Sequence, residues 1–431
     1  MTLTHSLDQP AAVERAVGAR TLDYQRVVDV FAFIFLSCGA IAFIEPSPYD
    51  FASFIALPLW FFGGFTVHRS FLVFGFLLIG FNLCGFLALA PHWDDPDSAL
   101  YQYQSAYLVL TGLFFALFFG NRTTRRLDVC LNGYALACFI AAIAGILGYF
   151  DVAGLGAEGM FKHAGRATGT FKDPNNLGSY IVLPIIYLLH LLVFGRTQRV
   201  VGSTIVLLVT FLGMFLSFSR GSYVNTILGV ALMLGAGYTT TKDPLMKRRI
   251  VKMTLASFAL VAVAVGALLA TPETAEFFSS RTAATQEYDA GETGRFGNQL
   301  RSLPMLLDRF WGFGPLGFRH YFDLDPHNSY VGAFANNGWI GGILFFLLVG
   351  VTIWIGLRQM FEDHPWRDHA QVIVPAMLGL MVQAIQIDVD HWRNLFFVWG
   401  AIWGIEAARQ RWIAAGRPGV GFDPRRPESV S

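Results

Sequence analysis

The chain has 431 residues, of which 54% are hydrophobic and 14% charged, and its net charge is +1. Soluble domains carry about a quarter charged residues, so this composition excludes an ordinary soluble globular protein. The near-zero net charge gives no indication of nucleic-acid binding.

Apolar runs of about 18 to 25 residues recur along the chain and predict transmembrane helices. We predict an all-α, polytopic membrane protein with about twelve spans. An N-terminal tail (1–26) precedes spans one to nine (27–270), a polar loop with a helix (271–328), spans ten to twelve (329–408) and a C-terminal tail (409–431). The approximate spans are 27–45, 51–67, 70–90, 101–120, 128–150, 175–195, 199–218, 222–240, 250–270, 329–357, 370–388 and 394–408.

The charges of the connecting loops predict the orientation. If both termini are cytoplasmic, 21 of the 31 lysines and arginines lie on the cytoplasmic side, as the positive-inside rule favours. The other ten cluster in a few outside segments. Basic residues on the disfavoured side indicate an anionic ligand, and contact with lipid phosphates is the alternative.

Two outside segments place basic residues beside helix starts. Asp173 and Pro174 predict the N-cap and first residue of the sixth span, with Arg166 and Lys172 next to them. The free amides of such a helix end suit a phosphate, although an ordinary capped helix is the alternative. Arg220 lies in a very short turn, FSRGSYV, almost at the membrane plane. It therefore needs a carboxylate or ligand phosphate as partner, unless it extends to the lipid headgroups.

The polar loop contains an amphipathic stretch from Thr293 to Phe310. Its apolar side chains fall on one helical face: Phe296, Leu300, Leu303, Leu307 and Phe310. Such a helix is expected to lie along the membrane surface. Arg295 and Arg301 point to different sides of it, and the planar fork of an arginine is suited to a diphosphate. Plain solvation of both side chains is the alternative.

Two further outside segments carry titratable groups. His327 and Asn328 directly precede the tenth span, where a histidine can act as a general base or simply be interfacial. A second turn, DVDHWRN, contains Asp388, Asp390, His391 and Arg393. Asp390–Arg393 and Asp388–Arg220 are candidate ion pairs. The two aspartates raise the question of a divalent metal, but their spacing specifies none.

The segment HNSYVGAFANNGWIGG, from His327 to Gly342, has His-Asn, nine residues and then Gly-x-x-Gly. This pattern resembles the signature of the O-antigen ligase family, which includes polysaccharide polymerases and protein O-oligosaccharyltransferases. RATGTFKDPN, the short SRG turn, the Gly-Pro turn GFGPLG and DHWR are also similar, in the same order. The resemblance spans roughly residues 160 to 405.

The resemblance implies a C-type glycosyltransferase-like fold and an inverting, metal-independent and cofactor-free transfer. The expected donor is a glycan on a polyprenyl (undecaprenyl) diphosphate, and the expected acceptor is a hydroxyl of lipid A core, in lipopolysaccharide or surface polysaccharide biosynthesis. By match to the family's motifs, His327 is the catalytic residue and Arg220, Arg295 and Arg166 bind the diphosphate. The expected location is the bacterial inner membrane, with the active site facing the periplasm. The possible supporting residues are Lys172, Arg301, Asn328, Asp388, Asp390, His391 and Arg393.

Four alternatives remain open at this point. One is a polymerase of O-antigen or exopolysaccharide repeat units, and another is transfer to protein. The third is a membrane scaffold without chemistry, which leaves the outside arginine cluster unexplained. The fourth is a polytopic transporter, for which twelve spans are also typical. The predicted span centres are nearly devoid of ionisable residues, and the functional charges gather at one outer end, which disfavours transport.

Overall fold

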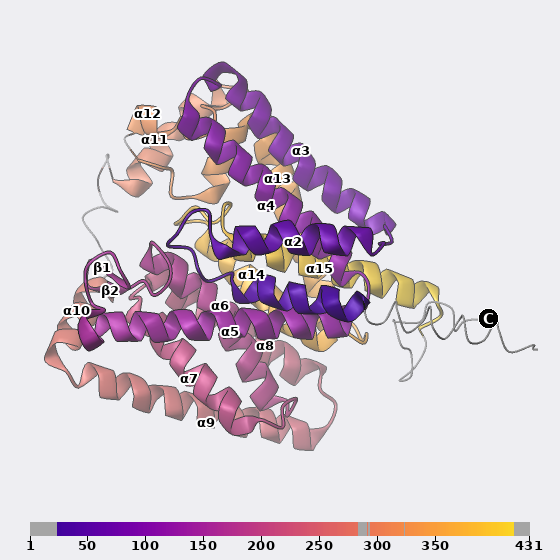
Figure 1. Cartoon of the computed structure of the whole chain (residues 1–431), viewed down its shortest axis with the longest axis vertical. Helices are drawn as coiled ribbons and strands as arrows, with labels where there is room; N and C mark the ends of the chain where they lie inside the picture. Colours follow the sequence, from indigo (N-terminus) through magenta and orange to yellow (C-terminus); the bar gives the residue numbers. More distant parts are fainter. Residues whose placement is uncertain (1–23, 283–290, 292–293, 323, 418–431) are drawn as a thin grey trace, which may run out of the picture.

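The structure, a computed structural model of the chain, describes residues 24–282, 291, 294–322 and 324–417. The predicted tails therefore lie mostly outside the described residues. Residues 24–37 are helical and lead into the labelled helices of Figure 1. The next helices are α2 (Pro48–Phe62), α3 (Arg69–Leu89), α4 (Pro96–Phe119), α5 (Thr123–Tyr149), α6 (Pro174–Val193), α7 (Val200–Leu216) and α8 (Arg220–Thr240). They are followed by α9 (Pro244–Leu269), α10 (Pro272–Thr282), α11 (Arg295–Leu307), α12 (Arg319–Phe322), α13 (Ser329–Phe361), α14 (Arg367–Gln383) and α15 (Arg393–Ala414).

The predicted all-α fold holds, apart from one small feature in the part of the chain that the structure describes. Two-residue strands β1 (Lys162–His163) and β2 (Arg166–Ala167) pair antiparallel in a short hairpin before α6. Short 3₁₀ turns also occur at Ala90–His92 and Val152–Gly154.

Several helices begin with the same local signal, a capping side chain followed by proline. Ser47, Asp95, Asp173 and Asp243 each accept a hydrogen bond from a backbone N–H in the first turn of the following helix. The proline that comes next has no N–H to satisfy and already has a helical φ. The predicted N-cap at Asp173 is confirmed, since its Oδ1 accepts from the N–H of Asn175 at 2.7 Å.

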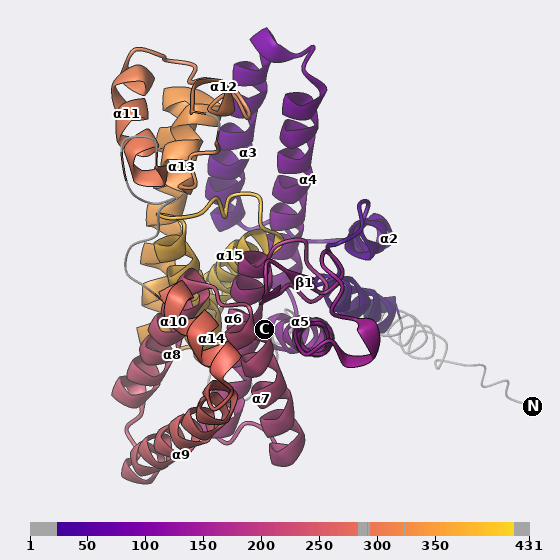
Figure 2. The same ribbon diagram turned by 90° about the vertical axis from the view of Figure 1, so that its left-hand side faces the viewer.

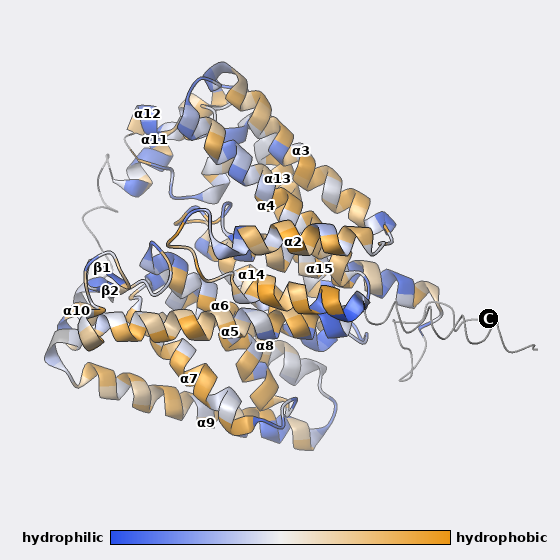
Figure 3. Ribbon diagram, viewed as in Figure 1, coloured by the Kyte–Doolittle hydropathy of each residue, from blue (hydrophilic) through white to orange (hydrophobic). Residues whose placement is uncertain are grey.

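The helices are those of a membrane protein, but the number of spans stays a prediction. Every predicted span overlaps a helix, whereas six helices in the described residues are long and apolar enough to cross a membrane. These are Arg69–His92, Pro96–Phe119, Thr123–Tyr149, Pro174–Val193, Pro244–Leu269 and Ser329–Phe361. On α9 only Ile250 is buried, while Phe258 is 74% exposed. Figure 3 shows this outward apolar surface, which water would disfavour and lipid accepts.

The helices pack in pairs that are distant in the sequence. Helix α3 contacts α13, α4 contacts α15, and α14 contacts both α8 and α6. Figures 1 and 2 show α3, α4 and α13 grouped at one end of the molecule and α7, α8 and α9 at the other, with α14 and α15 between them. The loop joining α14 to α15, residues 384–392, therefore lies where the two groups meet.

Helix α13 is interrupted at Gly338, whose φ of 69° and ψ of −172° are not helical. The polar loop fills the gap: Phe313 donates its N–H to the carbonyl of Ala335 at 2.7 Å, and Trp339 donates to the carbonyl of Phe310 at 2.9 Å. A side chain at Gly338 would meet the Phe310 carbonyl oxygen 2.6 Å from its Cβ. The first glycine of the Gly-x-x-Gly pattern is thus required by backbone geometry and close approach.

Candidate active site

His327 lies in the turn that starts α13. Asn328 caps the helix, because its side-chain oxygen accepts the N–H groups of Tyr330 and Val331 at 3.0 and 3.2 Å. The two N–H groups just before the helix donate to one carboxylate, that of Asp388: His327 at 3.1 Å and Asn328 at 2.9 Å. His327 itself has a left-handed φ of 47°. Asp388 therefore holds the strained turn that presents the histidine.

The His327 side chain is 34% exposed, and its Nδ1 lies 3.7 Å from an oxygen of Asp388. Burial and the nearby positive charge of Arg295 lower the pKa of His327, and the negative charges of Asp325 and Asp173 oppose them only in part. A lowered pKa keeps the imidazole neutral at neutral pH, which is the form that accepts a proton.

Gln299 supports this turn from α11. Its Nε2 donates to the carbonyl of Pro326 at 2.9 Å, and its Oε1 accepts from the side chain of Asn328 at 3.3 Å. Asn298, Gln299 and Ser302 of α11 are buried against the protein, whereas the predicted apolar face points outward, with Leu300 69% exposed. This arrangement agrees with a helix that lies along a membrane surface and turns its polar face toward the site.

Asp388 and Asp390 have opposite environments. Burial and the charge of Asp390 raise the pKa of Asp388, although its two backbone bonds act against the shift. Burial also acts to raise the pKa of Asp390, but the hydrogen bond and charge of His391 outweigh it and lower the pKa overall. Asp390 accepts hydrogen bonds from Ser329 at 3.3 Å and from Tyr101 at 3.4 Å. One carboxylate of the pair thus holds its proton more tightly than the other.

Arg295 and Arg220 both lie beside the end of α14. The Nη1 of Arg295 donates to the carbonyl of Gln386 at 3.0 Å. Arg220 is the first residue of α8, and the next residue, Gly221, packs so closely on Gln383 that a Cβ there would lie 2.9 Å from its Nε2. Of the two arginines predicted to bind a diphosphate, Arg295 therefore contacts the loop whose Asp388 holds His327, and Arg220 begins a helix that packs on the end of α14 just before that loop.

Arg166 is buried and is linked to the site through the turn that carries Arg220. It donates from Nε to the carbonyl of Ser217 and from Nη2 to the side chain of Asn175, both at 2.8 Å. Ser217 precedes the turn that carries Arg220, so Arg166 joins that turn to the start of α6. We infer that Arg166 positions the turn, in addition to any contact with a ligand.

Three other predicted residues have partners elsewhere. Lys172 pairs with Glu45 at 2.6 Å. Arg393 pairs with Asp50 at 3.0 Å, so the predicted Asp390–Arg393 pair is wrong. Helix α15 begins at Arg393 and brings its side chain to α2. Arg301 is exposed, and its guanidinium carbon lies 5.7 Å from the centre of the Phe322 ring.

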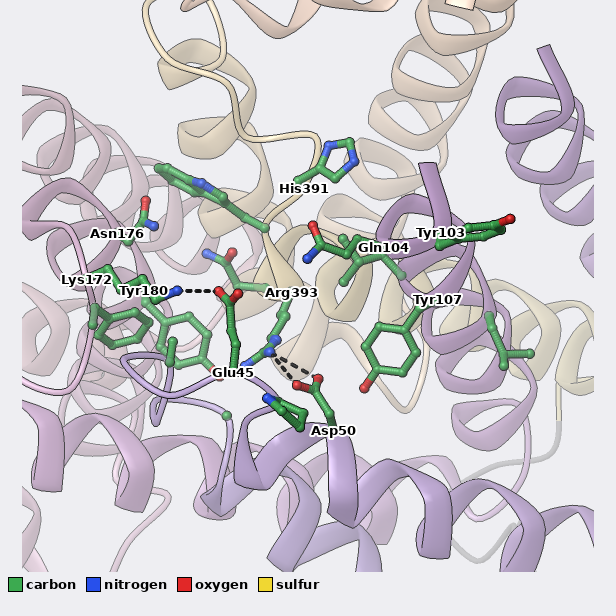
Figure 4. Close-up of a pocket in the computed structure, with 18 of the residues that line it drawn as sticks. Glu45, Asp50, Tyr103, Gln104, Tyr107, Lys172, Asn176, Tyr180, His391 and Arg393 are labelled. Atoms are coloured by element: carbon green, nitrogen blue, oxygen red, sulfur yellow. Dashed lines mark hydrogen bonds and ion pairs between the residues drawn. The ribbon is translucent and has the colours of Figure 1, made fainter. Parts of the chain in front are cut away.

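Lys172, His391 and Arg393 line a cavity of about 930 Å³ between α2, α4, α6 and the start of α15 (Figure 4). Sequence analysis missed several other polar residues of its lining, among them Glu45, Asp50, Gln104 and Asn176. A usable signal was that residues 46–50 contain Asp50 but no lysine or arginine, so that the partner of this carboxylate, Arg393, comes from a distant segment. In the described residues no group of three or more His, Cys, Asp or Glu side chains is placed to hold a metal.

One family of known proteins matches part of the chain. Residues 205–346 match the family model described as O-antigen ligase. This segment, about a third of the chain, is therefore similar to that family. The predicted resemblance is confirmed over this segment, and with the apolar helices it supports a membrane glycan transferase of the ligase or polymerase type. No curated protein matches the chain.

The matched segment contains part of the candidate site. Arg220, Arg295, Arg301, His327 and Asn328 lie within the matched residues. Arg166, Lys172 and the residues from Asp388 to Arg393 lie outside them. The loop that holds the His327 turn is thus contributed by the chain beyond the matched segment.

Proposed function

We propose that this protein transfers a glycan from a polyprenyl diphosphate carrier to a hydroxyl of lipid A core, with His327 as the general base. The observation that carries the proposal is that the His327 turn and Arg295 both bond to one loop, residues 384–392. Asp388 fixes the His327 turn through two backbone bonds, and Arg295 contacts Gln386 two residues before it. Both His327 and Arg295 lie in the segment matched by the O-antigen ligase family.

In this mechanism the acceptor hydroxyl loses its proton to His327 as its oxygen attacks the anomeric carbon. The bond from that carbon to the phosphate oxygen breaks at the same time, and the diphosphate leaves on its lipid with the electron pair. Arg295 and Arg220, with Arg166 behind the Arg220 turn, stabilise the charge that develops on the leaving group. Attack opposite the leaving group inverts the anomeric carbon. The arginines supply the positive charge, so the step requires no metal.

The remaining predicted residues keep these groups in place. Asn328 caps α13, Asp388 bonds the backbone of the His327 turn, and Asp390 joins Ser329, Tyr101 and His391. We place the site on the periplasmic side of the inner membrane, with both termini in the cytoplasm. The asymmetric distribution of lysine and arginine supports this orientation.

The lipid-linked glycans of a strain lacking the protein test the proposal. Long polymers that accumulate on the polyprenyl carrier are the expected result, because the final transfer to lipid A core is missing. Single repeat units on the carrier would instead identify a polymerase. Unchanged lipid-linked glycans would contradict both and favour the transporter.

A complementation series tests the mechanism in the same strain. The wild-type gene should restore transfer, and His327→Ala should not, although the variant still inserts in the membrane. His320→Ala is the matched control, because His320 is an exposed histidine in the same polar loop. Restoration of transfer by His327→Ala would remove His327 from the mechanism.

A further inference from the structure

The cavity shown in Figure 4 is separate from the His327 turn but shares a loop with it. The loop of residues 384–392 contacts Arg295 through Gln386 and lines the cavity through His391 and Trp392. His391 hydrogen-bonds Asp390 at 3.2 Å, and Asp390 accepts from Ser329, two residues after His327. A ligand in the cavity therefore lies against the C-terminal side of the loop, whereas Arg295 contacts its N-terminal side.

The charges that line the cavity are balanced within it. Lys172 pairs with Glu45 at 2.6 Å, and both oxygens of Asp50 accept from Nη2 of Arg393, at 3.0 and 3.2 Å. A phosphate would have to displace these carboxylates from their cations. Ion pairs of this kind instead offer donors and acceptors side by side, which suits the hydroxyl groups of an uncharged ligand.

Two polar atoms in this wall have no partner in the described part of the chain. Nη1 of Arg393 is a donor, and Nε2 of His391 is a donor or an acceptor according to the tautomer; both are buried and make no hydrogen bond there. Both residues line the cavity. Buried polar atoms without partners are costly, so a ligand hydroxyl group, which can both donate and accept, would remove a penalty from an atom that it reaches.

Aromatic and amide side chains complete the lining. Figure 4 shows Tyr103, Gln104 and Tyr107 of α4 on one side, opposite Lys172, Asn176 and Tyr180. Flat rings pack against the apolar C–H faces of a pyranose, and planar amides pair with its hydroxyls. The wall continues onto Phe54 and Leu110, which are 69% and 54% exposed on the outer surface. This apolar extension suits the hydrocarbon part of a lipid-linked sugar.

We infer that this cavity binds the glycan of the acceptor, presented as a glycolipid whose sugar enters between Tyr103 and the Arg393–Asp50 pair. The inference rests on the proposed function. It assigns Lys172, His391 and Arg393 to sugar recognition instead of phosphate binding. It also gives a role to the first 110 residues, which lie outside the matched O-antigen ligase segment.

Lipid that copurifies with the full chain tests the inference without any transfer assay. The protein is extracted from its host membrane with a styrene–maleic acid polymer, because a maltoside detergent would itself present sugar to the cavity. Mass spectrometry then quantifies the endogenous lipids. Wild type is expected to carry glycolipid, and Tyr103→Ala/Gln104→Ala about tenfold less, equivalent to about 1.4 kcal/mol of binding.

The variant should remain folded, because both side chains are exposed on α4. Tyr238→Ala, an exposed tyrosine at the other end of α8, is the matched control and should carry as much glycolipid as wild type. Equal glycolipid in the cavity variant would overturn the inference. The inference would also be overturned if the wild-type protein carried no glycolipid, or if the lipid that the cavity variant loses contained no sugar.

Transfer kinetics separate the cavity from the diphosphate site. In the Tyr103→Ala/Gln104→Ala variant, the KM for the acceptor should be about tenfold higher than in wild type. The kcat should change less, and the KM for the donor should not change. A raised KM for the donor would overturn the inference. If His327→Ala still transfers glycan, the proposed mechanism fails, whereas the copurified glycolipid remains a separate measure of the cavity.

Discussion

The two sides of the loop between α14 and α15 use the same residue types for different purposes. On one side, His327 and Asp388 have shifted pKa values and are held by backbone bonds. On the other, His391 stacks on Tyr101, with ring centres 3.9 Å apart, and Arg393 is paired with a carboxylate. We propose that the first side serves proton transfer and the second serves recognition of the acceptor sugar. A histidine or arginine near a membrane surface thus acquires its role from its partners.

The largest expected effect tests the proton-transfer side. His327→Ala should lower the rate of glycan transfer about 100- to 10,000-fold, the range of a lost general base. His320→Ala should leave it near the wild-type value. Rates are measured with purified protein and lipid-linked donor. If the transfer rate of His327→Ala stayed within about tenfold of wild type, His327 would not be the general base, and the His327 side of the loop would not be the reactive one.

The next effect concerns the leaving group. Arg295→Gln should lower the transfer rate about 100-fold, as expected when a charged donor to a developing anion is removed. Arg295→Lys should recover only part of the loss, because an ammonium lacks the planar fork. Arg309→Gln is the matched control, since Arg309 lies in the same loop and packs on the rings of Phe313 and Tyr321. Equal losses of transfer rate in Arg295→Gln and Arg309→Gln would contradict a specific role of Arg295.

A smaller effect is expected across the loop. His391→Phe keeps a ring against Tyr101 but loses the bond to Asp390, whose pKa should rise because His391 lowers it. Transfer should fall about tenfold, the order of one charge-assisted hydrogen bond. The measurement compares the kcat of His391→Phe with the kcat of His327→Ala. Equal losses for the two histidines would remove the distinction between the two sides.

The smallest effect is a change in pH dependence. A neutral base is active above its pKa, and burial lowers the pKa of His327, so activity should fall only below the ordinary histidine value of about 6.5. Asp325 acts to raise this pKa. Asp325→Asn should therefore move the acid limb of the rate profile to lower pH, with little change at the plateau. An acid limb that moves to higher pH in Asp325→Asn would show that His327 is not the titrating group.

Features that depend on neighbouring residues were predictable from the sequence. The cap at Asp173, the amphipathic face of α11 and the positions of the helices all follow from short-range patterns. The family pattern from His327 to Gly342 located the helix start that the structure places beside Asp388. These signals located the His327 side of the loop, which we propose is the reactive one.

The recognition side depends on contacts between distant segments, which no local pattern reveals. Arg393 and Asp50 are 343 residues apart, and Tyr101 and Asp390 are 289 apart. The nearer pairing of Arg393 with Asp390 was predicted because the two residues share a turn. It is wrong because Ser329 and Tyr101 hold Asp390 while α15 carries Arg393 toward α2. The span count stays open for a related reason, since hydropathy alone does not measure how a helix is covered.

The interruption at Gly338 has a mechanical consequence. Backbone from the polar loop is bonded on both sides of the break, to Ala335 before it and to Trp339 after it. The outer part of α13, which begins beside His327, is therefore joined to the rest of the helix by loop backbone as well as by its own chain. The position of the His327 turn relative to the rest of α13 thus depends on the polar loop, so a change that displaces this loop would also displace the turn.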